Sequence, residues 1–103
     1  MEGIMKVTPI KAWTYCIRVW LSDVMKYFRP SWNNIDVEID GKFYKFNLTP
    51  TCPEFRGGPI TDWLRTQGLL TWPYGQPPQF DLIHICDNKF RLLRNEQWII
   101  IKR

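Results

Sequence analysis

The chain of 103 residues lacks the short motifs that mark the common enzyme classes. It contains no phosphate-binding glycine loop, no dinucleotide fingerprint, no nucleophile elbow and no H-E-x-x-H sequence. His84 is the single histidine, and a nucleophile pair with Cys86 would need an orienting group and an oxyanion site that the sequence does not offer. We therefore predict a protein that is not an enzyme, with no catalytic residue, no metal and no cofactor.

Closely spaced cysteines and long apolar runs are also missing. Cys16, Cys52 and Cys86 form no C-x-x-C pair, which excludes the common zinc and thiol-redox motifs and predicts free thiols in a reducing compartment. No run approaches the roughly 18 to 20 apolar residues of a membrane span, and the first residues lack the apolar core of a signal peptide. We expect a cytoplasmic protein, nuclear in a eukaryotic cell, that is not secreted and has no membrane partner.

Positive charge is in excess and is unevenly distributed. The chain has 14 Lys and Arg against 10 Asp and Glu, a formal net charge of +4. Residues 1–30 and 87–103 each hold five basic and two acidic groups, whereas residues 31–55 hold two basic and four acidic groups. A basic face attracts polyanions such as nucleic acid, and a mixed solvated surface explains the same counts. The charge pattern leaves both interpretations open.

The first thirty residues predict two strands and a short helix. Apolar and aromatic residues alternate after residue 10 and up to residue 21, which is the period of a strand. A shorter strand over residues 5–7 precedes it, and Pro9 separates the two. Ser22 is the expected N-cap of a short helix that ends before Pro30.

The middle of the chain predicts a hairpin and a second helix. Asp40-Gly41 is a favoured two-residue turn, which pairs Ile39 with Lys42, Val37 with Tyr44 and Ile35 with Phe46. Residues 49–58, with two prolines and two glycines, are expected to form a loop. A helix then begins near Pro59 and ends before Gly68, and its apolar face is formed by Ile60, Trp63 and Leu64.

The last third predicts a meander of strands. A turn at Asp87-Asn88 sets Ile85 opposite Phe90 and Ile83 opposite Leu92. A second turn at Asn95-Glu96 brings Ile99 and Ile101 to the same core face. The fold class is therefore α+β, in a single domain over residues 1–103. Its curved, mostly antiparallel sheet carries two short helices, and curling the sheet into a barrel would cover its second, partly apolar face.

This element order resembles that of the DNA-binding pseudobarrel family, which includes plant B-three transcription-factor domains and the recognition domains of some restriction endonucleases. Residues 36–46 are similar to the family's hairpin with an acidic turn, a Gly-Lys pair and aromatics. Residues 60–69 are similar to its second helix, and residues 79–82 resemble the strand that follows. The resemblance implies a seven-stranded open pseudobarrel that grips the major groove of duplex DNA without being an enzyme.

The resemblance also implies which residues contact DNA. One contacting loop would cover residues 8–12, with Thr8 and Lys11, and the other residues 49–58, with Arg56. Lys11 and Arg56 would enter the groove, and the candidate phosphate contacts are Arg18, Lys45 and Arg65.

Two other functions stay open at this stage. A small protein-interaction module would use exposed aromatics such as Trp32, Trp72 and Tyr74 as anchors, since Trp and Tyr dominate interface hot spots. A single-strand or RNA binder would stack the same kind of side chain on unpaired bases. The sequence does not determine the oligomeric state.

Overall fold

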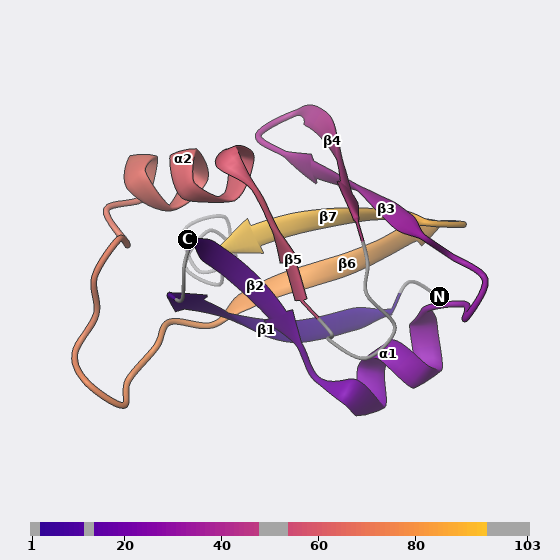
Figure 1. The fold of residues 1–103 in the computed structure, drawn as a ribbon, viewed down its shortest axis with the longest axis horizontal. Coiled ribbons are helices and arrows are strands. Elements are labelled where there is room, and N and C mark those ends of the chain that lie inside the picture. Colours follow the sequence, from indigo (N-terminus) through magenta and orange to yellow (C-terminus); the bar gives the residue numbers. More distant parts are fainter. Residues whose placement is uncertain (1–2, 12–13, 48–53, 95–103) are drawn as a thin grey trace, which may run out of the picture.

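A computed structural model describes residues 3–11, 14–47 and 54–94. Figure 1 shows the elements of this part of the chain in their order. They are β1 (Ile4–Lys11), β2 (Tyr15–Val19), α1 (Leu21–Tyr27), β3 (Asn34–Ile39), β4 (Lys42–Asn47), β5 (Glu54–Arg56), α2 (Gly58–Thr66), β6 (Phe80–Cys86) and β7 (Lys89–Arg94). Neither helix of the described residues is long enough to cross a membrane.

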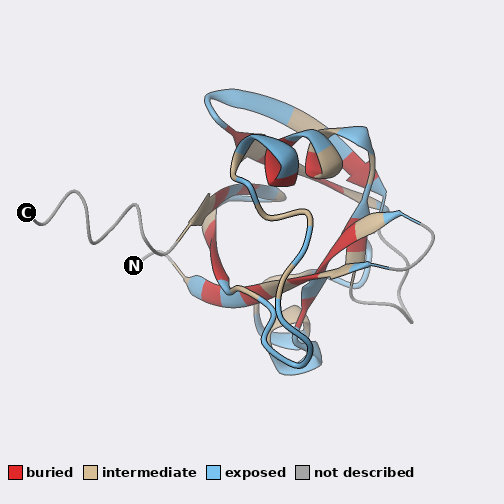
Figure 2. Ribbon diagram, turned by 90° about the vertical axis from the view of Figure 1, so that its left-hand side faces the viewer, coloured by how far each residue is buried: buried red, intermediate tan, exposed pale blue. Residues whose placement is uncertain are grey.

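All seven strands join one sheet in the order β4-β3-β7-β6-β1-β2-β5. Every neighbouring pair is antiparallel except β3 and β7, which run parallel. The sheet curls until its two outer strands, β4 and β5, approach each other, although the described residues form no ladder between them (Figures 1 and 2). The result is a nearly closed barrel with one seam, which confirms the predicted α+β class and the curved, mostly antiparallel sheet.

The barrel interior is filled by alternate residues of the strands. Buried and exposed positions alternate along β1, β3 and β5, so that one face of each strand points inward (Figure 2). The seam itself is bridged by rings, because Phe46 of β4 and Phe55 of β5 lie with centroids 5.1 Å apart. Apolar contact therefore replaces the missing hydrogen bonds where the barrel does not close.

The predicted hairpin is confirmed in full. The Cα register pairs Ile39 with Lys42, Val37 with Tyr44 and Ile35 with Phe46. Asp40 and Gly41 have φ of 52° and 87°, and positive φ at both central residues is what the tight turn between twisted strands requires. Turn chemistry and strand alternation specify the same register, which is why the sequence predicts it correctly.

The second helix is also confirmed. Within α2, Ile60, Trp63 and Leu64 are buried, and Gly68 follows the helix with a φ of 71°. Trp63 packs edge-on against Phe80 of β6, with ring centroids 4.8 Å apart. In Figure 1, α2 and α1 lie toward opposite ends of the strands. Trp63 thus contributes to the core, as its helical spacing predicts.

The predicted break at Pro9 is wrong. β1 continues through Pro9, and the expected contact loop over residues 8–12 is strand as far as Lys11. β1 pairs with β6 only over residues 4–7, whereas its pairing with β2 runs from residue 7 to 11. At Pro9 the strand therefore has a partner on one side alone, and such a position tolerates a residue without an amide hydrogen.

Two boundaries near the predicted loops also need correction. Helix α1 begins at Leu21 with Trp20 at the N-cap position and no side-chain cap, so Ser22 lies inside the helix. Residues 54–56, predicted as loop, form β5 opposite residues 16–18 of β2. A three-residue strand is too short to produce a period in the sequence, and only its partner reveals it.

The register of β6 and β7 differs from the predicted one. The turn at Asp87-Asn88 and the pair Cys86–Lys89 are present, but a bulge at Ile85 sets His84 opposite Phe90 and Leu82 opposite Leu92. Ile85 is therefore not opposite Phe90, and Leu82 rather than Ile83 shares the face of Leu92. Both faces of β6 carry apolar residues, so alternation could not reveal an inserted residue.

Some predictions concern residues outside the described ranges. These are residues 12–13 of the predicted contact loop and strand, residues 49–53 with Cys52, and the turn at Asn95-Glu96 with Ile99 and Ile101.

Replacement of Phe55 tests the seam. Phe55 is fully buried, so Phe55→Ala should lower the free energy of unfolding by about 3–5 kcal/mol, because it removes the ring that meets Phe46. Phe43→Ala on the neighbouring strand is the control, since that ring is 50% exposed and its loss should cost less than about 1 kcal/mol. Urea unfolding followed by tryptophan fluorescence measures both. Equal losses for the two variants would contradict the role of the seam contact.

Candidate functional site

The outward side of β1, β2 and β5 gathers basic side chains into one surface, here called the cationic face. Its cations are Lys6, Arg18 and Arg56. The register places Thr8 of β1 opposite Arg18 of β2, with Glu54 of β5 opposite Arg18 on its other side. Since Val7, Ile17 and Phe55 of these strands point into the core, the residues beside them must point outward.

Glu54 holds two of these cations. Its Oε2 accepts hydrogen bonds from Arg18 Nε at 3.2 Å and Nη2 at 2.8 Å, and its Oε1 accepts one from Arg56 Nη2 at 3.1 Å. The Glu54 side chain is only 7% exposed, whereas those of Arg18 and Arg56 are 47% and 49% exposed. The carboxylate therefore lies below the surface and the two guanidinium groups lie above it.

Lys6 and Asp81 repeat this arrangement on the neighbouring strands. Lys6 Nζ lies 2.6 Å from Asp81 Oδ1, and the two residues are opposite each other in the β1–β6 ladder. The Asp81 side chain is 6% exposed and that of Lys6 is 53% exposed. Here too, solvent meets the cation rather than the acid.

The depth of the charged groups determines which charge this face exposes to a partner. Two buried carboxylates lie beneath three half-exposed cations, so that the outer layer is positive although the formal sum is +1. Within the described part of the chain, Arg18 Nη1 and Arg56 Nε and Nη1 donate no hydrogen bond. Each guanidinium is therefore oriented by Glu54 and still has donors for an anion.

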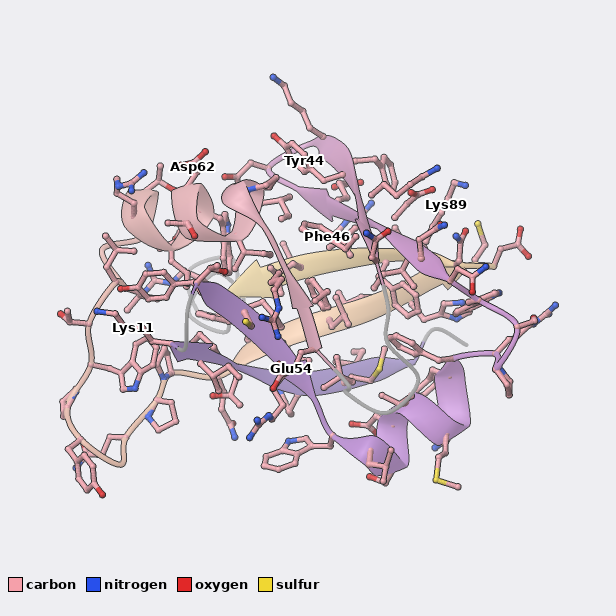
Figure 3. The ribbon with its side chains drawn as sticks, viewed as in Figure 1. Lys11, Tyr44, Phe46, Glu54, Asp62 and Lys89 are labelled. Carbon is pink, nitrogen blue, oxygen red and sulfur yellow. The ribbon has the colours of Figure 1, made fainter. Side chains whose placement is uncertain are left out.

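Two predicted residues lie on β1. Thr8 is on the cationic face, whereas Lys11 alternates with Val7 and Pro9 and so belongs to the other side of the strand. The Thr8 hydroxyl donates to the carbonyl of Pro78 at 3.2 Å, so it ties β1 to the segment before β6. Lys11, at the end of β1, has its Nζ 5.6 Å from the ring centroid of Tyr15. Figure 3 shows Lys11 toward one end of the molecule and Glu54 nearer its centre.

Lys45 and Arg65, however, are not part of the cationic face. Lys45 is on β4, opposite Asp36 in the hairpin. Arg65 is on α2 and pairs with Asp62 at 2.9 Å, where both side chains are well exposed. Asp62 and Tyr44 of β4 lie along the upper edge in Figure 3, away from Glu54. The fold thus brings together Thr8, Arg18 and Arg56. It leaves Lys11 at the end of β1 on the side of Val7, and it leaves Lys45 and Arg65 on separate elements.

Sequence reasoning missed Lys6, Asp81 and Glu54. Lys6 alternates with Met5 and Val7, so reading β1 as one continuous strand would have placed it on the side of Thr8. Glu54 and Asp81 gave no such signal. Their roles depend on which strands become neighbours.

The acidic residues of the hairpin form a separate, neutralised patch. Glu38 Oε2 lies 3.0 Å from Arg91 Nε, and Asp36 Oδ2 lies 3.9 Å from Lys89 Nζ across the β3–β7 ladder. Over residues 3–11, 14–47 and 54–94, no three His, Cys, Asp or Glu side chains group closely enough to hold a metal ion.

Comparison of the chain with protein families, with characterised proteins and with solved structures finds no match.

Removal of the buried carboxylate tests the layered arrangement. Glu54→Gln should lower the free energy of unfolding by about 1–3 kcal/mol, because three charge-assisted hydrogen bonds lose their anionic acceptor. Asp62→Asn is the matched control, since it breaks an exposed ion pair and should cost about 0.5 kcal/mol or less. Urea unfolding at pH 7 measures both variants. Unchanged stability in Glu54→Gln would show that the carboxylate does not hold the arginines.

Proposed function

We propose that this protein binds duplex DNA through the cationic face and is not an enzyme, in the manner of the pseudobarrel domains that its element order resembles. The observation that carries the proposal is the pair of half-exposed guanidinium groups held by Glu54, which have further N–H groups without a hydrogen-bond partner among the described residues. We further propose that it acts in the cytoplasm, or in the nucleus of a eukaryotic cell. The proposed activity requires no cofactor.

Fixed cations suit a phosphate backbone for an entropic reason. An unrestrained arginine loses side-chain freedom when it binds, and this loss reduces the affinity. Arg18 and Arg56 have lost part of that freedom in the folded protein, because Glu54 already orients them. Their remaining N–H groups can donate to phosphate oxygens, for which the planar guanidinium is well shaped.

The proposal divides the face between two roles. Lys11 is opposite Tyr15, and Arg56 is opposite the adjacent Cys16, so both lie at the same end of the strands but on opposite sides of the sheet. Arg56 would reach toward base edges in the major groove from the cationic face, and Lys11 would do so from the end of β1. Lys6 and Arg18, farther along β1 and β2, would contact phosphates and hold the register of the protein on the duplex.

A protein-interaction function is the second candidate, and one observation favours it. Trp20 at the N-cap of α1 and Leu21 and Met25 within it are 52%, 59% and 77% exposed. These residues, together with the fully exposed Tyr74, replace Trp32 as candidate anchors, since Trp32 packs against Phe28 and Phe90. Adjacent exposed apolar side chains are typical of protein interfaces.

Fluorescence anisotropy with a labelled random duplex tests the first candidate. Arg18→Ala combined with Arg56→Ala should weaken binding at least about tenfold at low salt, since each lost charged hydrogen bond is worth about 1.5–3 kcal/mol. The slope of log K against log salt should also fall by about 0.9 for each lost phosphate contact. Lys45→Ala combined with Arg65→Ala removes the same charge from outside the face and serves as the control.

The outcomes separate the candidates. Equal loss in the control would mean that net charge, and not the cationic face, drives binding. Tighter binding of the matching single strand would favour base stacking over groove recognition. If the wild-type protein does not bind either form at low salt, the DNA proposal is overturned and the interaction function gains support. Circular dichroism of each variant checks that the fold is intact.

A further inference from the structure

A cavity lies between the end of α1 and the turn that joins β6 to β7. The cavity there has a volume of about 240 Å³. Its walls come from Lys26, Tyr27, Phe28 and Trp32 on one side and His84 on the other. None of these residues belongs to the cationic face, so the inference does not depend on DNA binding there.

Tyr27, Phe28 and Trp32 bring aromatic rings to the cavity. Phe28 lies with its ring centroid 4.9 Å from that of the fully buried Phe90, and Trp32 meets Phe90 edge-on at 6.1 Å. The rings of Phe28 and Trp32 are 5.9 Å apart, and both side chains are half-buried. These two rings are therefore anchored in the core and still border the cavity. A flat ring is the kind of ligand that such a surface stacks well.

His84 brings a directed polar group to the same cavity. The bulge at Ile85 sets His84 opposite Phe90, with ring centroids 5.1 Å apart. Its Nε2 lies 2.7 Å from the carbonyl oxygen of Asp87. Since a carbonyl only accepts, Nε2 carries the hydrogen, and Nδ1 is an acceptor with no hydrogen-bond partner among the described residues. Bulges often re-aim side chains in this way at functional sites.

The Tyr27 ring packs against the backbone of Gly3. A side chain on Gly3 would overlap the Tyr27 ring, so the backbone of residue 3 packs directly against it. The carbonyl of Gly3 accepts the backbone N–H of His84 at 2.9 Å, which ties the same segment to β6. Two walls of the cavity are thus positioned by one short backbone segment.

Positive charge lies beside the rings. Lys26 Nζ is 5.3 Å from the Tyr27 ring centroid, and Arg29 also lines the cavity. Both residues are exposed, and neither forms an ion pair with any residue in the described ranges. Asp87 is the carboxylate at this cavity, so the lining has two cations and one anion. The balance favours a ligand with a negative group.

We propose that this cavity binds one nucleotide unit, with its base against Phe28 and Trp32 and its phosphate at Lys26 and Arg29. His84 Nδ1 would hydrogen-bond to the edge of the base. The volume is below the roughly 300–1,000 Å³ of pockets that enclose a drug-sized ligand, so the cavity would take the base while the ribose and phosphate lie at its mouth. The unit comes either from the free nucleotide pool or from an unpaired position in a strand.

Isothermal titration calorimetry with AMP, GMP, CMP and UMP tests the proposal. At least one should bind, and adenosine and ribose 5-phosphate should each bind at least about tenfold more weakly, since each lacks one half of the recognised chemistry. Arg29→Ala should weaken the nucleotide about tenfold and leave the nucleoside unchanged, because one charge-assisted contact is lost. Arg65→Ala, which removes an exposed arginine from α2, is the matched control.

Three further results decide the matter. Gly3→Ala should also weaken nucleotide binding, because the new methyl group displaces Tyr27. Arg18→Ala with Arg56→Ala should leave nucleotide affinity unchanged, which separates this site from the cationic face.

A duplex with one extruded base, compared with the fully paired duplex, tests whether the bound nucleotide belongs to a strand. Tighter binding of the extruded base that Arg29→Ala abolishes would identify the strand as the source. Two results would overturn the proposal. The first is that no mononucleotide binds at millimolar concentration and that the duplex with an extruded base binds no more tightly than the paired duplex. The second is that Arg29→Ala changes neither the affinity for the nucleotide nor that for the extruded base.

Discussion

The pairing of β5 with β2 is the constraint on which both the barrel and its cationic face depend. β5 has three residues, and alternation along a strand sends the middle one to one side and its neighbours to the other. Phe55 points inward and meets Phe46 across the seam, while Glu54 and Arg56 point outward beside Arg18. A shift of one residue would place the carboxylate in the core and the ring in solvent. Both consequences are unfavourable, so the core and the surface select the same register.

The two proposed binding regions use different physical means. On the cationic face, buried carboxylates orient half-exposed cations, and these cations offset the cost of removing the carboxylates from water. At the α1 cavity, rings anchored on Phe90 supply area, and Lys26 and Arg29 lie beside them without an acidic partner among the described residues. A face of charged heads suits an extended polyanion, and a cavity with rings suits a single planar group. The two regions could therefore serve one nucleic-acid ligand or two separate ones.

The elements that could be predicted are those in which nearby turn residues and the apolar period indicate the same structure. The hairpin around Asp40-Gly41 and the buried face of α2 are confirmed because each is determined within about a dozen residues. The predicted register of β6 and β7 was wrong because apolar residues on both faces of β6 concealed the bulge at Ile85. The predicted strand break at Pro9 was wrong for another reason. A proline interrupts a strand only where a neighbouring strand needs its missing amide hydrogen, and the neighbouring strand is set by the tertiary structure.

By itself the sequence determined the α+β class, the two helices and the β3–β4 hairpin. These follow from the period of apolar residues, from turn residues and from the proline and glycine that end the helices, all of which act over short distances along the chain. Only the tertiary structure decided that Arg18 and Arg56 share one carboxylate and that Lys45 and Arg65 lie elsewhere. It also decided that His84 lies beside the rings next to α1. Charge and ring contacts of this kind join residues far apart in sequence, and the order of strands around a barrel is set by burial of the whole core rather than by any one segment.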